Sequence, residues 1–214
     1  MIVLVDYGMG NLRSVEKAFE ARGARPKITS SISEIEKADK IILPGVGAFG
    51  QAMQELKKRK LIAPLKEKIL SGTPYLGLCL GLQLLFSTSE EADEKGLGVL
   101  PGKVKRFRGD LKVPHMGWNT LSVKKKDSPL MKGVRSTDHF YFVHSYYAVS
   151  DEKETISSTT RYGIEFCSSV WKDNIFATQF HPEKSQENGL RLVENFIAYD
   201  PAPQPVYQRV GGAG

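Results

Sequence analysis

The fold of this chain is decided by residues 75–86, Tyr75–Phe86, which read YLGLCLGLQLLF. The stretch opens as an apolar run long enough for a buried strand and continues with apolar residues at helical spacing. Cys79 stands between the halves, with a glycine two residues away on each side. A sharp strand-to-helix turn crowds these two flanking positions, and only a missing side chain relieves the clash. The spacing therefore predicts a nucleophile elbow with cysteine as the nucleophile.

The predicted turn places the Cys79 sulfur at the start of a helix, where unpaired N–H groups and the helix dipole stabilise a thiolate. The alternative is a small buried core residue, which most cysteines in apolar surroundings are. The symmetric glycines favour a nucleophile, which needs a base elsewhere in the chain. His181-Pro182-Glu183 supplies one at the end of a strand-like segment. The proline keeps residue 181 extended, and the carboxylate is suited to orient the imidazole.

Composition limits the classes of protein that fit. The chain has 214 residues, of which 41% are hydrophobic, so it can bury a sizeable core. Its two cysteines, Cys79 and Cys167, are too few for a disulfide-stapled secreted domain, which indicates a reducing, cytoplasmic setting. No Cys/His cluster has metal-ligand spacing. The apolar N-terminal run is too short for a signal peptide or a membrane span.

The net charge of +6 permits anionic partners. The basic clusters at 57–60 and 124–126 are short, and we interpret them as solvated surface. The hypothesis of nucleic-acid binding is supported by the net charge alone, and it predicts binding to DNA or RNA that weakens steeply with salt. We therefore expect no nucleic-acid partner.

The first half of the chain alternates strand-like and helical segments, which predicts an α/β fold with a mostly parallel central sheet flanked by helices. Strands are expected at 2–5, 26–29, 40–43 and 75–78, and one helical segment is expected through residues 53–69. The second half is expected to be richer in antiparallel strands, at 104–107, 121–124 and 138–147, with a hairpin at 166–180 and a helix at 190–197. Residues 114–119 are expected to form a polar-aromatic turn.

We expect one domain over residues 1–200, followed by a Pro/Gly-rich and disordered tail at 201–214. Two glycine-rich turns follow predicted strands. The turn at 6–11 lacks the third glycine of a dinucleotide-binding fingerprint, because Arg13 occupies that position. The turn at 44–50 suits either a backbone that approaches a ligand or a tight turn that needs positive φ.

Cys79 in an elbow and His181-Pro182-Glu183 together resemble the class I (triad) glutamine amidotransferases. Five further stretches narrow the resemblance to the glutaminase subunits of imidazole glycerol phosphate synthases: Asp6–Asn11, Pro44–Gly47, Gly77–Gln83, Pro114–Asn119 and Phe142–Tyr146. The Pro114–Asn119 sequence, PHMGWN, is the most diagnostic of these. The resemblance spans residues 2 to about 199.

The resemblance implies hydrolysis of the glutamine side-chain amide by Cys79 as nucleophile, His181 as base and Glu183 as orienting carboxylate, without a metal or cofactor. It implies oxyanion donors at Val46, Gly47 and Leu80. It implies that glutamine is bound by Gly47, Gln83, Glu91, His144, Ser145 and Tyr146. Ser145 stands where a threonine is common in the family, which preserves the hydroxyl.

The resemblance also implies a heterodimer with a (β/α)8-barrel synthase subunit, which receives the ammonia to make imidazole glycerol phosphate and AICAR in histidine biosynthesis. The barrel would contact Met9, Asn11, Trp118, Asn119, Tyr141 and Lys184. Because glutaminase activity in this family rises when the barrel holds its ligand, we expect the free chain to be weakly active.

Three other functions fit parts of the pattern. A glutaminase that feeds pyridoxal phosphate synthase is disfavoured by the Pro114–Asn119 sequence. A catalytically idle scaffold is disfavoured by the intact Cys79, His181 and Glu183 set. A cysteine peptidase of similar fold is disfavoured by the His-Pro-Glu order.

Overall fold

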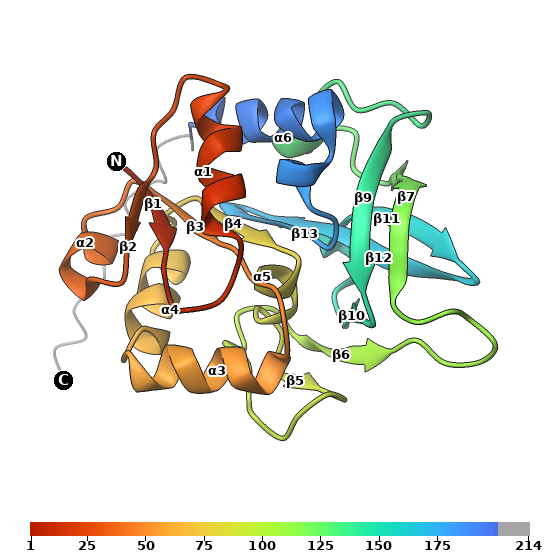
Figure 1. The fold of residues 1–214 in the computed structure, drawn as a ribbon, viewed down its shortest axis with the longest axis horizontal. Coiled ribbons are helices and arrows are strands. Elements are labelled where there is room, and N and C mark those ends of the chain that lie inside the picture. Colours follow the sequence, from red (N-terminus) through yellow and green to blue (C-terminus); the bar gives the residue numbers. More distant parts are fainter. Residues whose placement is uncertain (201–214) are drawn as a thin grey trace, which may run out of the picture.

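A computed structural model describes residues 1–200 of the chain. Its main feature is an eight-stranded sheet with the order β2-β1-β3-β4-β13-β12-β11-β8 (Figure 1). The five strands on one side are parallel: β2 (Lys27–Thr29), β1 (Ile2–Val5), β3 (Lys40–Leu43), β4 (Tyr75–Leu78) and β13 (Ile175–Thr178). The other three are antiparallel: β12 (Ile164–Lys172), β11 (Ile156–Tyr162) and β8 (Ser122–Val123). The expected α/β fold, with a mostly parallel central sheet and an antiparallel second half, is confirmed.

Helices cover both faces of the parallel strands (Figure 1). One face carries α1 (Leu12–Glu20) and α6 (Gln186–Ala198). The other carries α2 (Ile32–Glu36), α3 (Phe49–Lys58) and α4 (Ile62–Leu70). Alternate side chains of a strand point to opposite faces, so Leu4 packs with the first group while Val3 and Val5 pack with the second.

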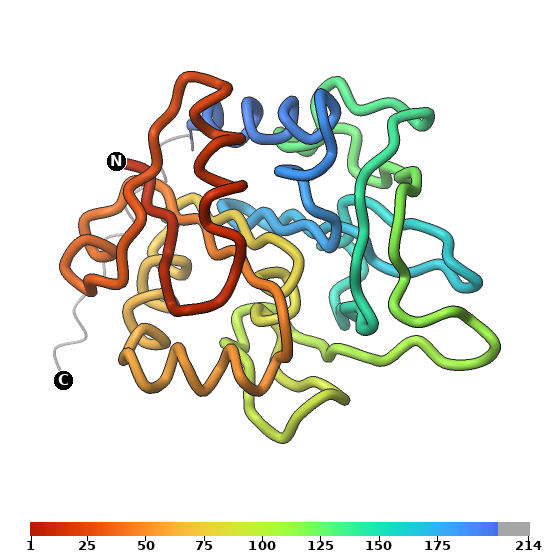
Figure 2. The backbone as a smooth tube through the Cα atoms, viewed as in Figure 1, coloured from red at the N-terminus to blue at the C-terminus, as the bar shows by residue number. Residues whose placement is uncertain are grey.

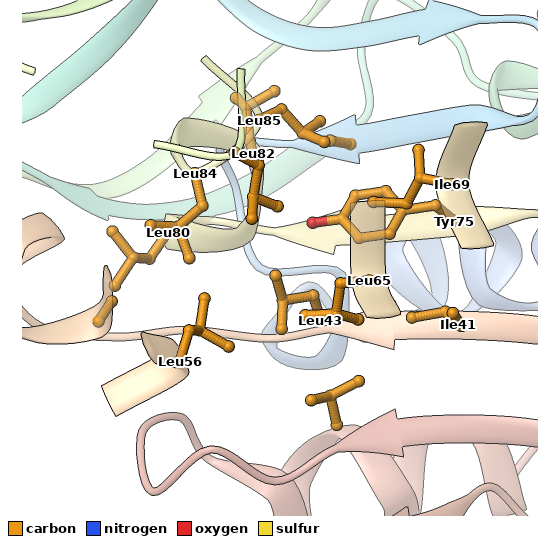
Figure 3. Packing of buried hydrophobic residues seen from close by; sticks show 14 of the residues in the cluster. Ile41, Leu43, Leu56, Leu65, Ile69, Tyr75, Leu80, Leu82, Leu84 and Leu85 are labelled. Atoms are coloured by element: carbon orange, nitrogen blue, oxygen red, sulfur yellow. The ribbon is translucent and has the colours of Figure 1, made fainter. Parts of the chain in front are cut away.

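The face under α3 and α4 supports the elbow. In Figure 3, Leu43 of β3 and Tyr75 of β4 lie among Leu65, Leu80 and other buried apolar side chains of this cluster. These residues are almost completely excluded from solvent. The start of β4, the strand that precedes Cys79, and the end of its neighbour β3 are therefore fixed by a packed core.

Two smaller sheets flank the antiparallel side of the molecule. One has the order β10-β6-β5 and consists of β10 (Tyr146–Ser150), β6 (Gly102–Arg106) and β5 (Thr88–Ser89). The other pairs β7 (His115–Thr120) with β9 (His139–His144) in antiparallel register. Figure 2 shows the backbones of this pair running side by side at the end of the molecule away from α2. Three short 3-10 helices, η1 (Pro129–Met131), η2 (Lys153–Thr155) and η3 (Pro182–Lys184), complete the described chain.

The expectation of a turn at residues 114–119 was wrong, because His115–Thr120 form strand β7. Each residue from His115 to Thr120 has a partner in β9, including Trp118 opposite Tyr141. Proline and glycine in this stretch suggested a turn, but the ladder with a distant segment outweighs such local preferences.

The helix after Cys79 is also shorter than the apolar spacing predicted. Helix α5 is the single turn Leu80–Gln83. The carbonyl of Leu84 accepts from the N–H of Leu97, and the carbonyl of Leu85 accepts from Val99 and Leu100. A loop from a later part of the chain thus takes the acceptors that a longer helix would use. The expected helical segment 53–69 likewise divides into α3 and α4, since Lys60 adopts a positive φ of 59°.

Within residues 1–200, no helix has the length and apolar character needed to cross a membrane. The tail expected at 201–214 lies outside the described residues.

Candidate active site

Three neighbouring parallel strands end at the same edge of the large sheet. Strand β4 lies between β3 and β13, with Leu43 opposite Gly77 and Thr178 opposite Leu78. The residues that follow are the 44–47 loop after β3, Cys79 after β4, and residues 179–181 after β13. This carboxyl edge is where open α/β sheets bind ligands. Topology therefore brings together Cys79 and His181, which are far apart in the sequence.

The elbow has the geometry that the sequence predicts. Cys79 has φ 53° and ψ −100°, a strained conformation between the strand and the helix. A Cβ atom on Gly77 would lie 2.6 Å from the carbonyl oxygen of Gly81. A Cβ atom on Gly81 would lie 2.0 Å from the carbonyl oxygen of Leu43. Both glycines are therefore required by close backbone approach, and the expected crowding on each side of the cysteine is confirmed.

His181 is buried and paired with a carboxylate. Its Nδ1 lies 2.7 Å from Oε1 of Glu183, and both side chains are almost fully excluded from solvent. Burial alone disfavours the imidazolium, but the Cys79 sulfur and Glu183 outweigh it and raise the pKa of His181 to about 10. Nε2 of His181 is buried without a hydrogen-bond partner among the described residues. The imidazole therefore has its far nitrogen held by Glu183 and its near nitrogen free for the chemistry at the sulfur.

The Cys79 side chain opens into a cavity of about 310 Å³. The cavity is lined by Val46, Gly47, Cys79, Leu80, Gln83, Glu91, Pro114, Val143, His144, Ser145 and Tyr146. All of the expected oxyanion and glutamine-binding residues are in this lining. Their separate roles stay predictions, since the arrangement shows proximity and not contact with a substrate.

Comparison with known proteins assigns the chain to a family. The family model described as glutamine amidotransferase class-I matches residues 3–199. The chain belongs to this family. The class-I amidotransferase chain described here is also 49% identical to the imidazole glycerol phosphate synthase subunit HisH of Syntrophotalea carbinolica, over 92% of this chain and 98% of that one. It is 52% identical to the subunit of the same name from Rhodopirellula baltica, over 92% and 96% of the two chains.

Solved structures show the same fold at low sequence identity. A glutamine amidotransferase crystal structure aligns with a TM-score of 0.72 at 18% identity, covering 91% of this chain and 98% of the other. The PurLQS structure from Thermotoga maritima aligns with a TM-score of 0.72 at 19% identity, covering 92% and 96%. These likenesses concern the arrangement of the sheet and helices.

Two of the expected glutamine-binding side chains of this amidotransferase are already engaged within the protein. Nε2 of Gln83 donates to the carbonyl oxygen of Tyr146 at 3.0 Å and to Oε1 of Gln179 at 3.1 Å. Oε2 of Glu91 accepts from the N–H of Phe49, the first residue of α3, at 2.9 Å. Gln83 therefore keeps only its amide oxygen for a ligand, and Glu91 keeps one carboxylate oxygen.

The ring of His144 has both nitrogens occupied. Nδ1 lies 2.8 Å from the carbonyl oxygen of Tyr146, and Nε2 lies 3.0 Å from Nδ1 of His115. Burial first, and then the nearby His115, lower the pKa of His144 to about 3, although the Tyr146 carbonyl opposes the shift. The neutral ring therefore cannot offer a nitrogen to glutamine, so a contact from His144 has to come from its backbone or ring carbons.

The residues expected at a subunit interface fall into two groups. Trp118, Tyr141 and Lys184 form a cluster: the two rings are 6.0 Å apart edge to face, and Nζ of Lys184 lies 5.8 Å above the Tyr141 ring. Trp118 is 48% exposed, beside an exposed Met116. Asn11 and Asn119 have internal roles: Asn11 accepts from the Ser14 N–H at the start of α1, and Asn119 bonds to Nε2 of His115. Met9 is partly buried against the core.

Sequence patterns missed Gln179 and gave His115 no role of its own. Nε2 of Gln179 lies 3.6 Å from the Cys79 sulfur. His115 stacks between Phe142 and Tyr162, with ring centroids 4.9 and 4.1 Å away. The available signal was a polar side chain in an otherwise apolar strand segment, which is costly unless it is hydrogen-bonded.

Proposed function

We propose that this chain is the glutamine-hydrolysing subunit of an imidazole glycerol phosphate synthase and supplies ammonia to a (β/α)8-barrel synthase subunit in histidine biosynthesis. One observation supports the proposal most strongly. About half of the residues are identical to those of subunits with that name, over more than nine-tenths of both chains. The Cys79, His181 and Glu183 geometry supplies the chemistry that such a subunit needs.

In the proposed reaction the Cys79 thiolate attacks the side-chain amide carbon of glutamine. The C–N bond then breaks, and the leaving nitrogen takes a proton from the His181 imidazolium. Water attacks the resulting thioester with His181 as base, which releases glutamate and regenerates the thiolate. Glu183 holds Nδ1 of His181 throughout, so that Nε2 faces the sulfur.

The cavity provides complementary groups for glutamine. The unpaired oxygens of Glu91 and Gln83 suit the α-ammonium group, because each oxygen accepts and neither has another assigned donor. Ser145, Tyr146 and Val143 also line the cavity. This arrangement would place the substrate's side-chain amide toward Cys79.

One expected oxyanion donor, the N–H of Leu80, is not free in this structure. The N–H of Leu80 donates to the carbonyl oxygen of Gly45, with 3.4 Å between nitrogen and oxygen. An oxyanion bound by Leu80 has to displace that carbonyl, so the 44–47 loop must change before the site can stabilise the tetrahedral intermediate. Gly47 in this loop has φ 106° and Val46 is 40% exposed, which leaves the loop able to respond to a partner. We therefore infer that the free chain hydrolyses glutamine slowly.

The Trp118–Tyr141–Lys184 cluster and Met116 give the proposed barrel subunit an apolar and aromatic contact surface. Tryptophan, tyrosine and methionine are enriched in such interfaces, and few other large apolar side chains in the described chain are this exposed. Met116, Trp118 and Tyr141 lie on strands β7 and β9. The same two strands carry His115, Val143 and His144, which line the cavity or support it. A partner docked here would lie next to the site that it receives ammonia from.

Glutamate release from glutamine tests the proposal. It is measured for the purified chain alone, with a barrel synthase subunit, and with that subunit carrying its nucleotide substrate. We expect strong release only in the liganded complex. Equal glutamate release in all three conditions would support the glutaminase activity and contradict its activation by the partner. No release in a confirmed complex with reduced Cys79 would overturn the assignment.

A further inference from the structure

The side-chain amide of Gln179 contacts the nucleophile from inside the protein. Its Nε2 lies 3.6 Å from Sγ of Cys79, and the Gln179 residue is completely buried. It does not belong to the cavity lining, so it reaches the sulfur from within the packed protein and not through the cavity. Gln179 follows β13 directly and precedes His181 by two residues. The same short segment therefore delivers two groups to the sulfur.

The direction of this amide is set by a fixed acceptor. The carbonyl oxygen of Tyr146 can only accept, so the Gln83 atom that lies 3.0 Å away is its NH₂ group. The second N–H of that group points to Gln179 at 3.1 Å, which requires an oxygen there. The other end of the Gln179 amide, which faces Cys79, must then be its NH₂ group. With the Gln179 amide flipped, its NH₂ group would face the NH₂ group of Gln83, donor against donor, and its oxygen would face the sulfur.

We propose that Gln179 is a further catalytic residue of this glutaminase, which holds Cys79 as a thiolate by donating an N–H to its sulfur. A thiolate is a much stronger acceptor than a thiol, so the bond favours the reactive form. Besides the His181 imidazolium, the sulfur has, within residues 1–200, the Val143 carbonyl 4.0 Å away, which can accept from a thiol and offers nothing to a thiolate. Gln83 is the positioning residue that keeps the donor aimed at Cys79. The catalytic meaning rests on the proposed function, whereas the donor–sulfur geometry does not.

The test measures how fast iodoacetamide alkylates Cys79, followed by mass spectrometry of the Cys79 peptide in the full-length chain. For Gln179→Met, which keeps the volume and removes the donor, we expect alkylation at pH 7 to slow by about 10-fold, the loss of one charge-assisted hydrogen bond. At pH 9.5 the rate should return to within about 2-fold of the wild-type rate, since most thiols are then ionised without help. The carboxylate in Gln179→Glu still accepts from Gln83 but presents an oxygen to the sulfur. Alkylation of Cys79 at pH 7 should therefore slow more in Gln179→Glu than in Gln179→Met.

Asn174→Leu is the matched control. Asn174 is a buried amide at the other end of β13, where it donates to the carbonyls of Ile69 and Thr73. Replacing Asn174 lowers stability but removes no contact of Cys79. The alkylation rate of Cys79 in Asn174→Leu should therefore stay at the wild-type value. If Gln179→Met does not fold, Gln179→Glu carries the test.

Equal slowing at pH 7 and pH 9.5, an unchanged rate at pH 7, or the same slowing in Asn174→Leu would each overturn the role of Gln179. In the complex, kcat for glutamine should fall with the alkylation rate while KM stays near its wild-type value, because Gln179 is outside the cavity. A complex that releases no glutamate, together with the expected alkylation pattern, would remove the proposed function and leave the thiolate contact standing.

Discussion

The N–H at Nδ1 of His115 donates to Nε2 of His144 across 3.0 Å, between two rings that are both buried. The direction follows from the Tyr146 carbonyl, which accepts from Nδ1 of His144 and leaves Nε2 of that ring as an acceptor. His115 then has its own Nε2 free to accept from Asn119, 3.3 Å away. Burial lowers the pKa of His115 to about 4, in agreement with this neutral pair. The chain Asn119–His115–His144 links strand β7 to the carbonyl that also positions Gln83.

This histidine pair predicts acid-sensitive stability. In the unfolded chain both rings protonate near pH 6.5, whereas the folded pKa values are about 4 for His115 and about 3 for His144. Their contribution is therefore fully present above pH 6.5 and is lost as the pH falls toward 4. His115→Phe keeps the stacking but removes one of the two groups, so the difference in unfolding free energy between wild type and variant should narrow by the order of 1 kcal/mol from pH 7 to pH 4.5.

The measurement is urea unfolding at a series of pH values. His181, whose folded pKa of about 10 lies above that of an unfolded histidine, is present in both the wild type and His115→Phe, so its pH effect cancels in the difference between them. His139→Gln, which replaces an exposed histidine of β9, serves as the control. Its difference in unfolding free energy from the wild type should stay constant with pH. A constant difference between His115→Phe and the wild type across this range would contradict the neutral-pair assignment.

The glycines of the elbow should tolerate no side chain. Gly81→Ala places a Cβ 2.0 Å from the carbonyl oxygen of Leu43, in backbone that the core holds on both sides. We expect a loss of at least about 3 kcal/mol of unfolding free energy, or no folded protein. Gly72→Ala is a control for adding a methyl group, since nothing lies within 4 Å of its Cβ position, although its φ of 95° adds some backbone strain. Thermal unfolding distinguishes the two, and a Gly81→Ala protein as stable as Gly72→Ala would be inconsistent with this geometry.

The two cysteines should differ sharply in reactivity. Cys79 lines the cavity, whereas Cys167 is buried in the core, where burial raises the pKa of its thiol to about 12. At pH 7.5 iodoacetamide should therefore modify Cys79 at least about 100-fold faster than Cys167 in the folded chain. Peptide mass spectrometry follows both sites, and unfolding in urea should abolish the difference. Comparable rates in the folded state would show that Cys79 lacks an activating environment.

Replacing Cys79 should separate catalysis from folding. Cys79→Ala is expected to lower glutamate release in the liganded complex by roughly 10⁴-fold or more, because the nucleophile, base and orienting group act as a unit. Cys167→Ser, outside the cavity, should leave release close to the wild-type value. The assay is glutamate formation, with circular dichroism to verify that both variants are folded. Substantial release by Cys79→Ala would require another nucleophile.

Trp118 should matter for assembly and not for stability. Its side chain is 48% exposed and touches the Tyr141 ring edge to face, so Trp118→Ala should change the unfolding free energy by less than about 1 kcal/mol. Affinity for the barrel subunit should fall by about 30-fold or more, as expected for an interface hot spot. Leu70→Ala removes another exposed apolar side chain, at the end of α4, and should not affect binding. Calorimetric titration measures both affinities for the barrel subunit. Equal effects of the two substitutions on affinity would contradict the placement of Trp118 in the interface.

Local sequence patterns were sufficient where the physics is local. The crowding around Cys79 involves residues two positions away, so the elbow was visible in Gly77 and Gly81. The Glu183 contact of His181 spans only one proline, so it too was predictable. The strand-helix alternation of the first half determined the parallel sheet and placed the candidate nucleophile Cys79 at its carboxyl edge.

Long-range pairing decided the remainder. Residues 115–120 form a strand only because β9 supplies the ladder, and α5 stops after one turn because residues 97–100 take the Leu84 and Leu85 carbonyls. The contact of Gln179 with Cys79 and of His115 with His144 joins segments that sequence spacing cannot register. The sequence by itself determined the candidate nucleophile, the candidate base and the sheet that carries them, because these follow from backbone crowding and strand order. Only the tertiary structure decided which buried polar groups are paired and in which direction their protons point, because that depends on acceptors contributed by distant strands.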